Sequence, residues 1–385
     1  MNISFQLKTK QLICVIFLLL CFISGANGQF KKVEGLDVLG VHFLETFQKD
    51  GNNYLTLGYM NDDYTKFIIE INKWNANSFD HHQLFTIKDV SYEKINFFYH
   101  NNEPYFILSG HTGIDIYRWN EVDEALTHIQ NIFKILPFLS HLQYFELNNT
   151  PWFAFYSSDE KIWVYEWDGT QFEDKTNFSS PGATLRPLYV DDTQYLITTF
   201  IGEPTKIYKW KGVRFMISND FQVSSVNKTL ENSFIYKNEQ FFLFFTSPWN
   251  EERGDTFEID RWNGESLEQA YTGTTKADTF NTFLIGERQF VSLPEDSMGN
   301  FTEEIYEWKD NQLVYYQTIE IKESSFSEYF TIDGKHYLIL SSFNNYPTLY
   351  EWQSSEEQKK ASLSDVICIL QVLAGNECGS QPENE

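Results

Sequence analysis

The chain has few cysteines and few basic residues. Only 4 of its 385 residues are cysteines, and Cys14 and Cys21 both lie within the first 28 residues. Lys and Arg together number 29, against 54 Asp and Glu. This excess of acid argues against nucleic acids and anionic membrane surfaces as partners, because both attract basic patches. We favour a solvated acidic surface over a specific basic partner as the interpretation.

Long apolar runs are also missing, with one exception at the start of the chain. Lys8 and Lys10 precede an apolar stretch at residues 12–23, and small residues follow at 26–28. This order is typical of a secretory signal peptide, and its apolar part is too short to span a bilayer. We therefore predict that residues 1–28 are a signal peptide, that the protein is secreted and that it does not insert into a membrane.

The rest of the chain carries two features that suit an oxidising, extracellular compartment. Cys368 and Cys378 are the two cysteines left after signal removal, and we predict a local disulfide between them. A bridge to a partner chain is the alternative. Sequons for N-glycosylation occur at four positions, and Pro151 after the first disfavours its use. These sequons are at Asn148, Asn177, Asn227 and Asn300.

Motifs for catalysis or metal binding are absent from the sequence. There is no Gly-x-Ser-x-Gly elbow, His-Glu-x-x-His zinc motif, glycine-rich phosphate loop or calcium loop. His81 and His82 come nearest to a metal pair, but neighbours on a strand point to opposite faces. We interpret them as turn histidines in solvent. The sequence thus predicts no cofactor, no metal site and no enzymatic activity.

A four-residue phrase recurs seven times: an aliphatic residue, a variable residue that is usually Tyr, a charged residue and Trp. Successive tryptophans lie 43 to 52 residues apart. The seven are Trp74, Trp119, Trp167, Trp210, Trp262, Trp308 and Trp352. A near-constant period of this length indicates an array of one supersecondary unit that is too small to bury its own core.

Each period contains four strand-like runs and no long apolar pattern of helical spacing. An aromatic run such as Trp152–Tyr156 precedes each phrase, with a turn and a further strand before it. A polar turn and a looser run such as Asp168–Phe172 follow the phrase. Four strands in each of seven periods predict an all-β fold, a seven-bladed β-propeller. The aliphatic residue and the Tyr of the phrase should pack on opposite faces of their strand.

The two ends of the repeat region predict how the ring closes. The seventh repeat stops at Gln353 without an outer strand, whereas Phe30–Asp37 precedes the first inner strand. We therefore predict that Phe30–Asp37 supplies the outer strand of the blade containing Trp352, within a propeller domain at 29–353. Residues 354–385 are predicted to be a polar linker and a short helix that docks on the propeller. Homo-oligomerisation or anchoring through this tail is the alternative.

The Trp phrase, its preceding aromatic strand and the following Gly or Asn turn resemble the EAR repeat, also called EPTP. The resemblance runs from about Phe30 to Gln353, although Asn72 and Asp260 replace Tyr in repeats one and five. The family includes the secreted leucine-rich glioma-inactivated proteins and the thrombospondin-type laminin G domain and EAR repeat protein. It implies an extracellular seven-bladed propeller that binds proteins, in the former case ADAM-type receptors. No leucine-rich or laminin-G segment accompanies it here, so no receptor is carried over.

Our leading hypothesis is therefore a secreted, non-catalytic module whose face loops bind a cell-surface receptor or a matrix protein. A lectin would repeat the same loop residues in every blade, whereas Asn61–Thr65 and Ser247–Asp255 differ. A propeller glycosidase with a single acidic site is the third hypothesis. Because the spacing is longest around Ser247–Asp255, we predict that Trp249 and Arg253 contact the partner. The alternative is that Trp249 folds over a blade edge.

Overall fold

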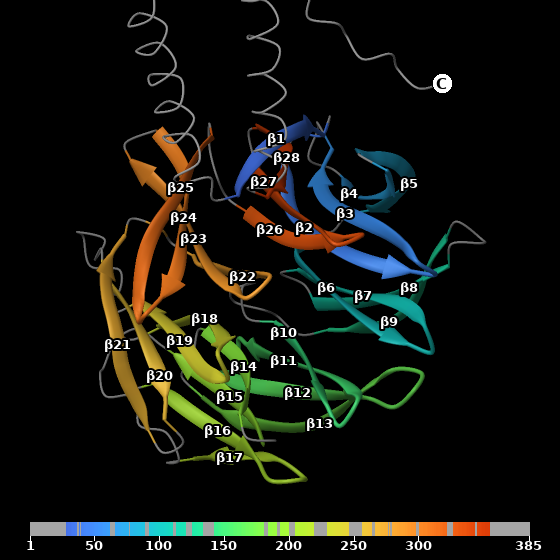
Figure 1. Ribbon diagram of the computed structural model, residues 1–385. Helices are drawn as coiled ribbons and strands as arrows, with labels where there is room; N and C mark the ends of the chain where they lie inside the picture. The colour runs from blue at the N-terminus through green and yellow to red at the C-terminus, as the bar shows by residue number, and fades with distance from the viewer. Residues whose placement is uncertain are drawn as a thin grey trace, which may run out of the picture. The chain divides into compact units, whose positions relative to one another are not determined.

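The computed structural model describes most of the repeat region. The described residues are 28–36, 38, 40–61, 66–76, 78–88, 92–110, 113–120, 125–133, 142–180, 184–190, 193–199, 205–218, 229–245, 256–263, 266–275, 277, 279–297, 300–321, 326–342 and 345–354. They form seven antiparallel sheets of four strands each, and no helix occurs among them. We number the sheets as blades one to seven along the chain (Figure 1).

Blade one consists of β2 (Val41–Lys49), β3 (Asn52–Met60), β4 (Lys66–Asn75) and β5 (Ser78–Lys88). Blade two consists of β6 (Tyr92–His100), β7 (Glu103–Gly110), β8 (Gly113–Asn120) and β9 (Ala125–Ile132). Blade three consists of β10 (Gln143–Leu147), β11 (Thr150–Ser157), β12 (Lys161–Trp167) and β13 (Phe172–Ser179). Blade four consists of β14 (Thr184–Val190), β15 (Thr193–Thr199), β16 (Lys206–Trp210) and β17 (Phe215–Ile217). Blade five consists of β18 (Thr229–Tyr236), β19 (Glu239–Phe245), β20 (Thr256–Trp262) and β21 (Leu267–Thr274). Blade six consists of β22 (Asn281–Ile285), β23 (Arg288–Ser297), β24 (Asn300–Lys309) and β25 (Gln312–Ile321). Blade seven consists of β26 (Phe326–Ile332), β27 (Lys335–Ser342), β28 (Asn345–Gln353) and β1 (Gln29–Gly35).

Blades one to six each pair four consecutive strands, whereas blade seven takes its outer strand from the start of the chain. Its strand order is β1-β28-β27-β26. The ring of Phe30 is buried and meets the ring of Trp352 edge-on, with 5.2 Å between the centroids. The prediction that the segment from Phe30 completes the blade containing Trp352 is therefore confirmed. The strand itself ends at Gly35, two residues before the predicted Asp37.

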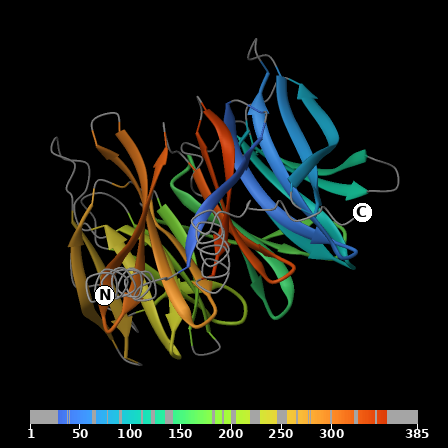
Figure 2. The same cartoon turned by 45° about the horizontal axis from the view of Figure 1, so that its top comes forward.

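A β-bulge follows the aliphatic residue of the Trp phrase. In five blades the register between the third and the outer strand shifts there, because the outer strand carries one extra residue. The shifts lie at Ile71/Asn72, Ile116/Tyr117, Val164/Tyr165, Ile259/Asp260 and Ile305/Tyr306. A bulge increases the local twist of a strand, and the blades are strongly twisted (Figure 2). The phrase thus encodes a bend as well as a core position.

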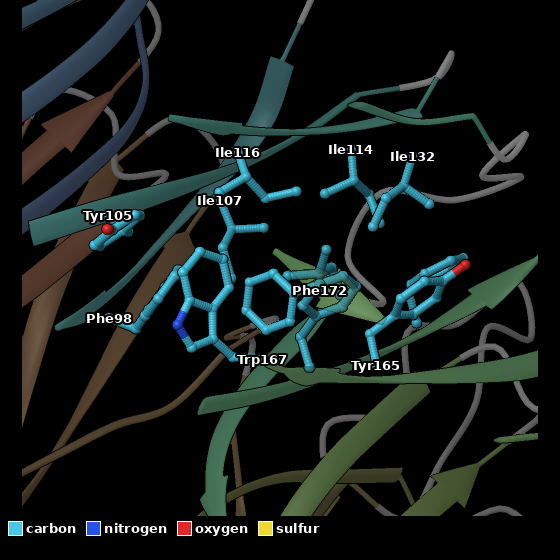
Figure 3. Packing of buried hydrophobic residues seen from close by; sticks show 12 residues of the cluster. Phe98, Tyr105, Ile107, Ile114, Ile116, Ile132, Tyr165, Trp167 and Phe172 are labelled. Atoms are coloured by element: carbon cyan, nitrogen blue, oxygen red, sulfur yellow. The ribbon is translucent and has the colours of Figure 1, made fainter. Parts of the chain in front are cut away.

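The tryptophans of the phrase pack against the preceding blade. Trp167 of blade three meets Phe98 and Tyr105 of blade two, with centroid distances of 5.0 and 5.1 Å. Figure 3 shows its indole between Phe98 and Phe172. Trp308 of blade six meets Phe234 of blade five in the same way. These contacts support our interpretation of the phrase as a packing element rather than a binding motif.

The chain divides into two compact units. The larger comprises residues 34–330 and 339–348, and the smaller comprises 1–33, 331–338 and 349–385. In the larger unit, successive blades contact each other through their first strands, which are therefore the inner strands. Tyr329 of β26 donates a hydrogen bond to Leu284 of blade six, and Phe330 meets Phe79 of blade one. The succession of blades in this unit therefore closes on itself, which confirms a seven-bladed β-propeller.

The smaller unit holds the pairing of β1 with the end of β28. Besides the contact between Phe30 and Trp352, Lys335 forms an ion pair with Glu351 at 3.2 Å. Nearly all of the predicted signal peptide and of the predicted tail helix lie outside the described residues. Within the described part of the chain, no helix is long and apolar enough to cross a membrane.

Candidate functional site

Exposed apolar side chains occupy one register position on the inner strands. This position is the penultimate residue of each inner strand, just before its hairpin turn. In four blades it holds a large apolar or aromatic residue that is 42 to 63% exposed. We call these four residues the apolar rim: Tyr99, Tyr189, Ile235 and Leu284. Gln48, Glu146 and Thr331 take the position in the other three blades.

Strand alternation explains why the rim faces solvent. The residue before each rim residue is buried against the next blade, as in Phe98 and Phe234. Because successive side chains point to opposite faces, the rim residue points away from this packing. The inner strands β14, β18 and β22 contact each other in turn. Tyr189, Ile235 and Leu284 therefore occupy the same position on three adjoining strands, and each is exposed.

Hydrogen bonds fix two tyrosine rings at or near rim positions. The hydroxyl of Tyr99 donates to the backbone oxygen of Gln48 at 2.7 Å and accepts from its backbone nitrogen at 2.9 Å. Burial of this hydroxyl raises the pKa of Tyr99. In blade seven, Tyr329 stacks on Phe283 and donates to the backbone oxygen of Leu284 at 2.8 Å. Rings fixed in this way lose little side-chain entropy when a partner covers them.

A cavity of about 560 Å³ opens in blade one, and we call it the blade-1 pocket. Leu57, Ile68 and Phe79 form part of its apolar wall. Its polar residues are Tyr59, Asn61, Glu70, Asn72 and His81. Glu70 lies at the centre of this polar group. Its Oε2 accepts a hydrogen bond from the Tyr59 hydroxyl at 2.9 Å, and its Oε1 lies 3.2 Å from Nδ1 of His81. Burial and the Glu70 carboxylate raise the pKa of Tyr59.

His81 and His82 do not lie in a turn, where the sequence pattern placed them. Both lie within strand β5 rather than in a turn. They do point to opposite faces, as alternation requires. His81 pairs with Glu70 in the blade-1 pocket, whereas the ring of His82 contacts Tyr54 and Trp119. The prediction that they lie in a turn was therefore wrong, because 78–88 continues as a strand through the bulge, although His81 is exposed as expected.

A second buried carboxyl group lies in blade six. Glu303 is fully buried, and burial raises its pKa to about 7. The hydroxyl groups of Ser292 and Ser327 counteract this shift, and Ser327 Oγ donates to Glu303 Oε1 at 3.2 Å. Asn281 in turn donates its Nδ2 to Ser327 Oγ. Searching the described residues finds no group of three or more His, Cys, Asp or Glu that could hold a metal ion.

The described sequon residues neither belong to the apolar rim nor line the blade-1 pocket. Trp249, Arg253, Cys368 and Cys378 are outside the described residues, so their roles stay predictions. Two sequon residues are exposed, Asn148 in the turn between β10 and β11 and Asn177 on the outer strand β13. Asn300 begins β24, and Asn227 is outside the described residues. Sequence reasoning missed the apolar rim, because an alignment of the seven hairpins brings the four residues into one column but does not show that they are exposed.

Comparisons with known proteins agree with the fold. Residues 312–353 match the family model of the EPTP domain, and this segment spans β25 to β28. Together with the seven blades, the match confirms the resemblance to the EAR/EPTP repeat family. No curated protein matches the chain in sequence.

Two solved structures resemble the fold at low sequence identity. The first is BBS1N, solved in complex with ARL6DN, at 10% identity and a TM-score of 0.54, covering 85% of this chain and 98% of that one. The second is a protein from Lactobacillus plantarum at 14% identity and a TM-score of 0.53, covering 74% and 86%. At such identities the likeness concerns the fold alone.

Proposed function

We propose that this EPTP-repeat propeller is an extracellular, non-catalytic module that binds another protein through its apolar rim. The observation that carries this proposal is the exposure of Tyr99, Tyr189, Ile235 and Leu284 at one register position. Aromatic and aliphatic side chains that gather on a surface favour protein interfaces, where a few such residues supply most of the binding energy. A cell-surface receptor or a matrix protein is the partner that this surface suits.

An enzymatic role has less support. Hydrolysis of a glycosidic bond generally requires two carboxyl groups that flank it. Glu70 is the one carboxylate among the described residues that line the blade-1 pocket, and Glu303 is fully buried. A lectin with one sugar site per blade also has less support, because the rim position holds unlike residues around the ring.

The rim is tested by the double substitution Ile235→Ser with Leu284→Ser. Removing two exposed apolar side chains should weaken capture of the partner by at least about tenfold, which corresponds to about 1.4 kcal/mol. Thermal stability should change little, because surface substitutions usually fall within about 0.5 kcal/mol. Wild-type and variant propellers are used to capture proteins from extracellular extract. Binding of the captured partner to each propeller is then measured by titration.

The matched control is Ile217→Ser with Met216→Ser. These two residues are also exposed and apolar, but they lie on the outer strand β17 of blade four. We expect this variant to retain the partner as the wild type does. If the rim variant folds and binds the partner as tightly as the control does, the apolar rim is not the binding surface.

The extracellular part of the proposal is tested at Asn177. Its side chain is exposed on β13, the outer strand of blade three. We expect the protein secreted by a eukaryotic host to carry a glycan there, and Asn177→Gln to increase its electrophoretic mobility. Treatment of the wild type with an N-glycan amidase should give the same shift at this site. Retention of the unmodified protein inside the host cell would contradict an extracellular role.

A further inference from the structure

The blade-1 pocket exists because blade one departs from the Trp phrase. In blade three, Tyr165 of the phrase stacks on Phe153 and Phe155, with centroid distances of 5.1 and 5.8 Å. The same register in blade one holds Asn72, with Leu55 directly opposite it. Leu57 takes the place of Phe155. Three rings are thus replaced by smaller side chains, and the cavity lies beside Leu57 and Asn72.

The amide of Asn72 is an unusual feature of this pocket. Only 4% of the residue is exposed, and its Nδ2 finds no hydrogen-bond partner among the residues that the structure describes. Leaving a buried polar group without a partner costs about 1–3 kcal/mol. Nδ2 is a donor, so the missing partner is an acceptor such as a carbonyl oxygen. A ligand in the pocket would supply the missing hydrogen bond.

The charge of the residues that line the blade-1 pocket indicates which class of ligand it can bind. Glu70 is 8% exposed, and each of its oxygens receives one donor, from Tyr59 or from His81. A carboxylate oxygen accepts about two hydrogen bonds, so one lone pair remains on each. The described lining residues include no Lys or Arg. A buried carboxylate is stabilised by a cation that brings hydrogen-bond donors to both oxygens.

We propose that the blade-1 pocket binds the arginine side chain of a peptide segment in a partner protein. The guanidinium group carries five donors in a planar fork, which matches the two free lone pairs of Glu70, and a backbone carbonyl of the peptide accepts the hydrogen bond from Nδ2 of Asn72. Its apolar stem fits the wall of Leu57 and Ile68, and its plane stacks on aromatic rings such as Tyr59. The volume of about 560 Å³ leaves room for residues on either side of the arginine.

The net charge of the chain supports the same ligand. The formal charge of −25 attracts a basic peptide and raises the rate of encounter. The blade-1 pocket contains none of the residues of the apolar rim. The proposal is therefore independent of the function proposed for the rim, and either can fail alone.

The test is calorimetric titration of the secreted protein with an acetylated and amidated Leu-Arg-Leu peptide. We expect binding at peptide concentrations below about 1 mM, and at least tenfold weaker binding when citrulline or lysine replaces the arginine. Citrulline keeps the shape of the side chain and removes its charge. Free arginine should also bind at least tenfold more weakly, because it lacks the flanking apolar residues. Equal binding of any of these three probes, or no binding of the peptide, overturns the proposal.

Two variants and one control assign the binding to this pocket. Glu70→Gln should weaken binding of the arginine peptide at least tenfold, and Asn72→Tyr should abolish it by filling the cavity. Asp115→Asn is the matched control. Asp115 also pairs with a histidine, His128, at 2.9 Å, but its blade holds Tyr117 at the phrase position that Asn72 takes in blade one. This control should bind as the wild type does. If Asn72→Tyr does not fold, Glu70→Gln decides: wild-type affinity of this variant overturns the proposal.

Discussion

Replacing Trp119 with Ala is expected to lower the free energy of unfolding by about 3–5 kcal/mol. The indole is fully buried and meets the rings of Phe47 and Tyr54 in the preceding blade, at 5.2 and 4.9 Å between centroids. Its Nε1 donates a hydrogen bond to Oε1 of the buried Gln83. The substitution therefore opens a cavity between two blades and leaves a buried amide oxygen without its donor, and both effects are destabilising.

Urea unfolding monitored by far-UV circular dichroism measures this loss. The control is Trp163→Ala, which removes an indole that is only partly buried and stands outside the repeated phrase. We expect it to cost less than half as much as Trp119→Ala. Equal losses for the two variants would mean that the phrase has no special role in joining the blades.

Stability should also depend on pH through Glu303. The pKa of this carboxyl group is raised from 4.5 to about 7 because it is fully buried. Below pH 4.5 the group is protonated in both the folded and the unfolded protein, so it costs no stability. Between pH 4.5 and about 7 the carboxyl group ionises in the unfolded protein but stays protonated in the folded one, so stability falls across this range and levels off above it. The full difference amounts to about 3 kcal/mol.

Glu303→Gln removes this dependence. The neutral amide retains groups that can bond to Ser327, so we expect the variant to match the wild type near pH 4.5 and to exceed it by about 3 kcal/mol at pH 8. Denaturant unfolding at a series of pH values provides the measurement. The control Glu320→Gln changes an exposed carboxylate of the same blade, and its stability should follow the wild-type pH profile. An unchanged pH profile in Glu303→Gln would show that the pKa of this group is the same in the folded and the unfolded protein.

The closure of blade seven illustrates how far sequence periodicity reaches. A missing outer strand after Gln353 and a surplus strand from Phe30 are both visible in the sequence, and β1 does complete that blade. The number of strands, the number of blades and the closure of the ring depend on local patterns. Each pattern can be compared across seven repeats of the same chain. For the same reason the buried aliphatic residues of the phrase could be assigned without coordinates.

The candidate surfaces were less accessible from the sequence. Tyr99 and Ile235 read as ordinary strand residues, and their segments do not show which face of the inner strand the next blade covers. The strand assignment of His81 and His82 failed because the extra bulge residue masks the alternation at 78–88. Asn72 was visible only as a departure from the phrase, and nothing in its own segment indicated a cavity.

The sequence by itself determined the seven blades, the position of each core residue in the Trp phrase and the strand that closes the last blade. These features follow from side-chain alternation and a constant period, both of which act within one repeat. The tertiary structure decided the apolar rim and the blade-1 pocket. An exposed surface depends on which neighbour covers each strand, and a cavity requires Asn72, Leu55 and Leu57 to be small together on paired strands. Such a coincidence becomes visible only when the register of the paired strands is known.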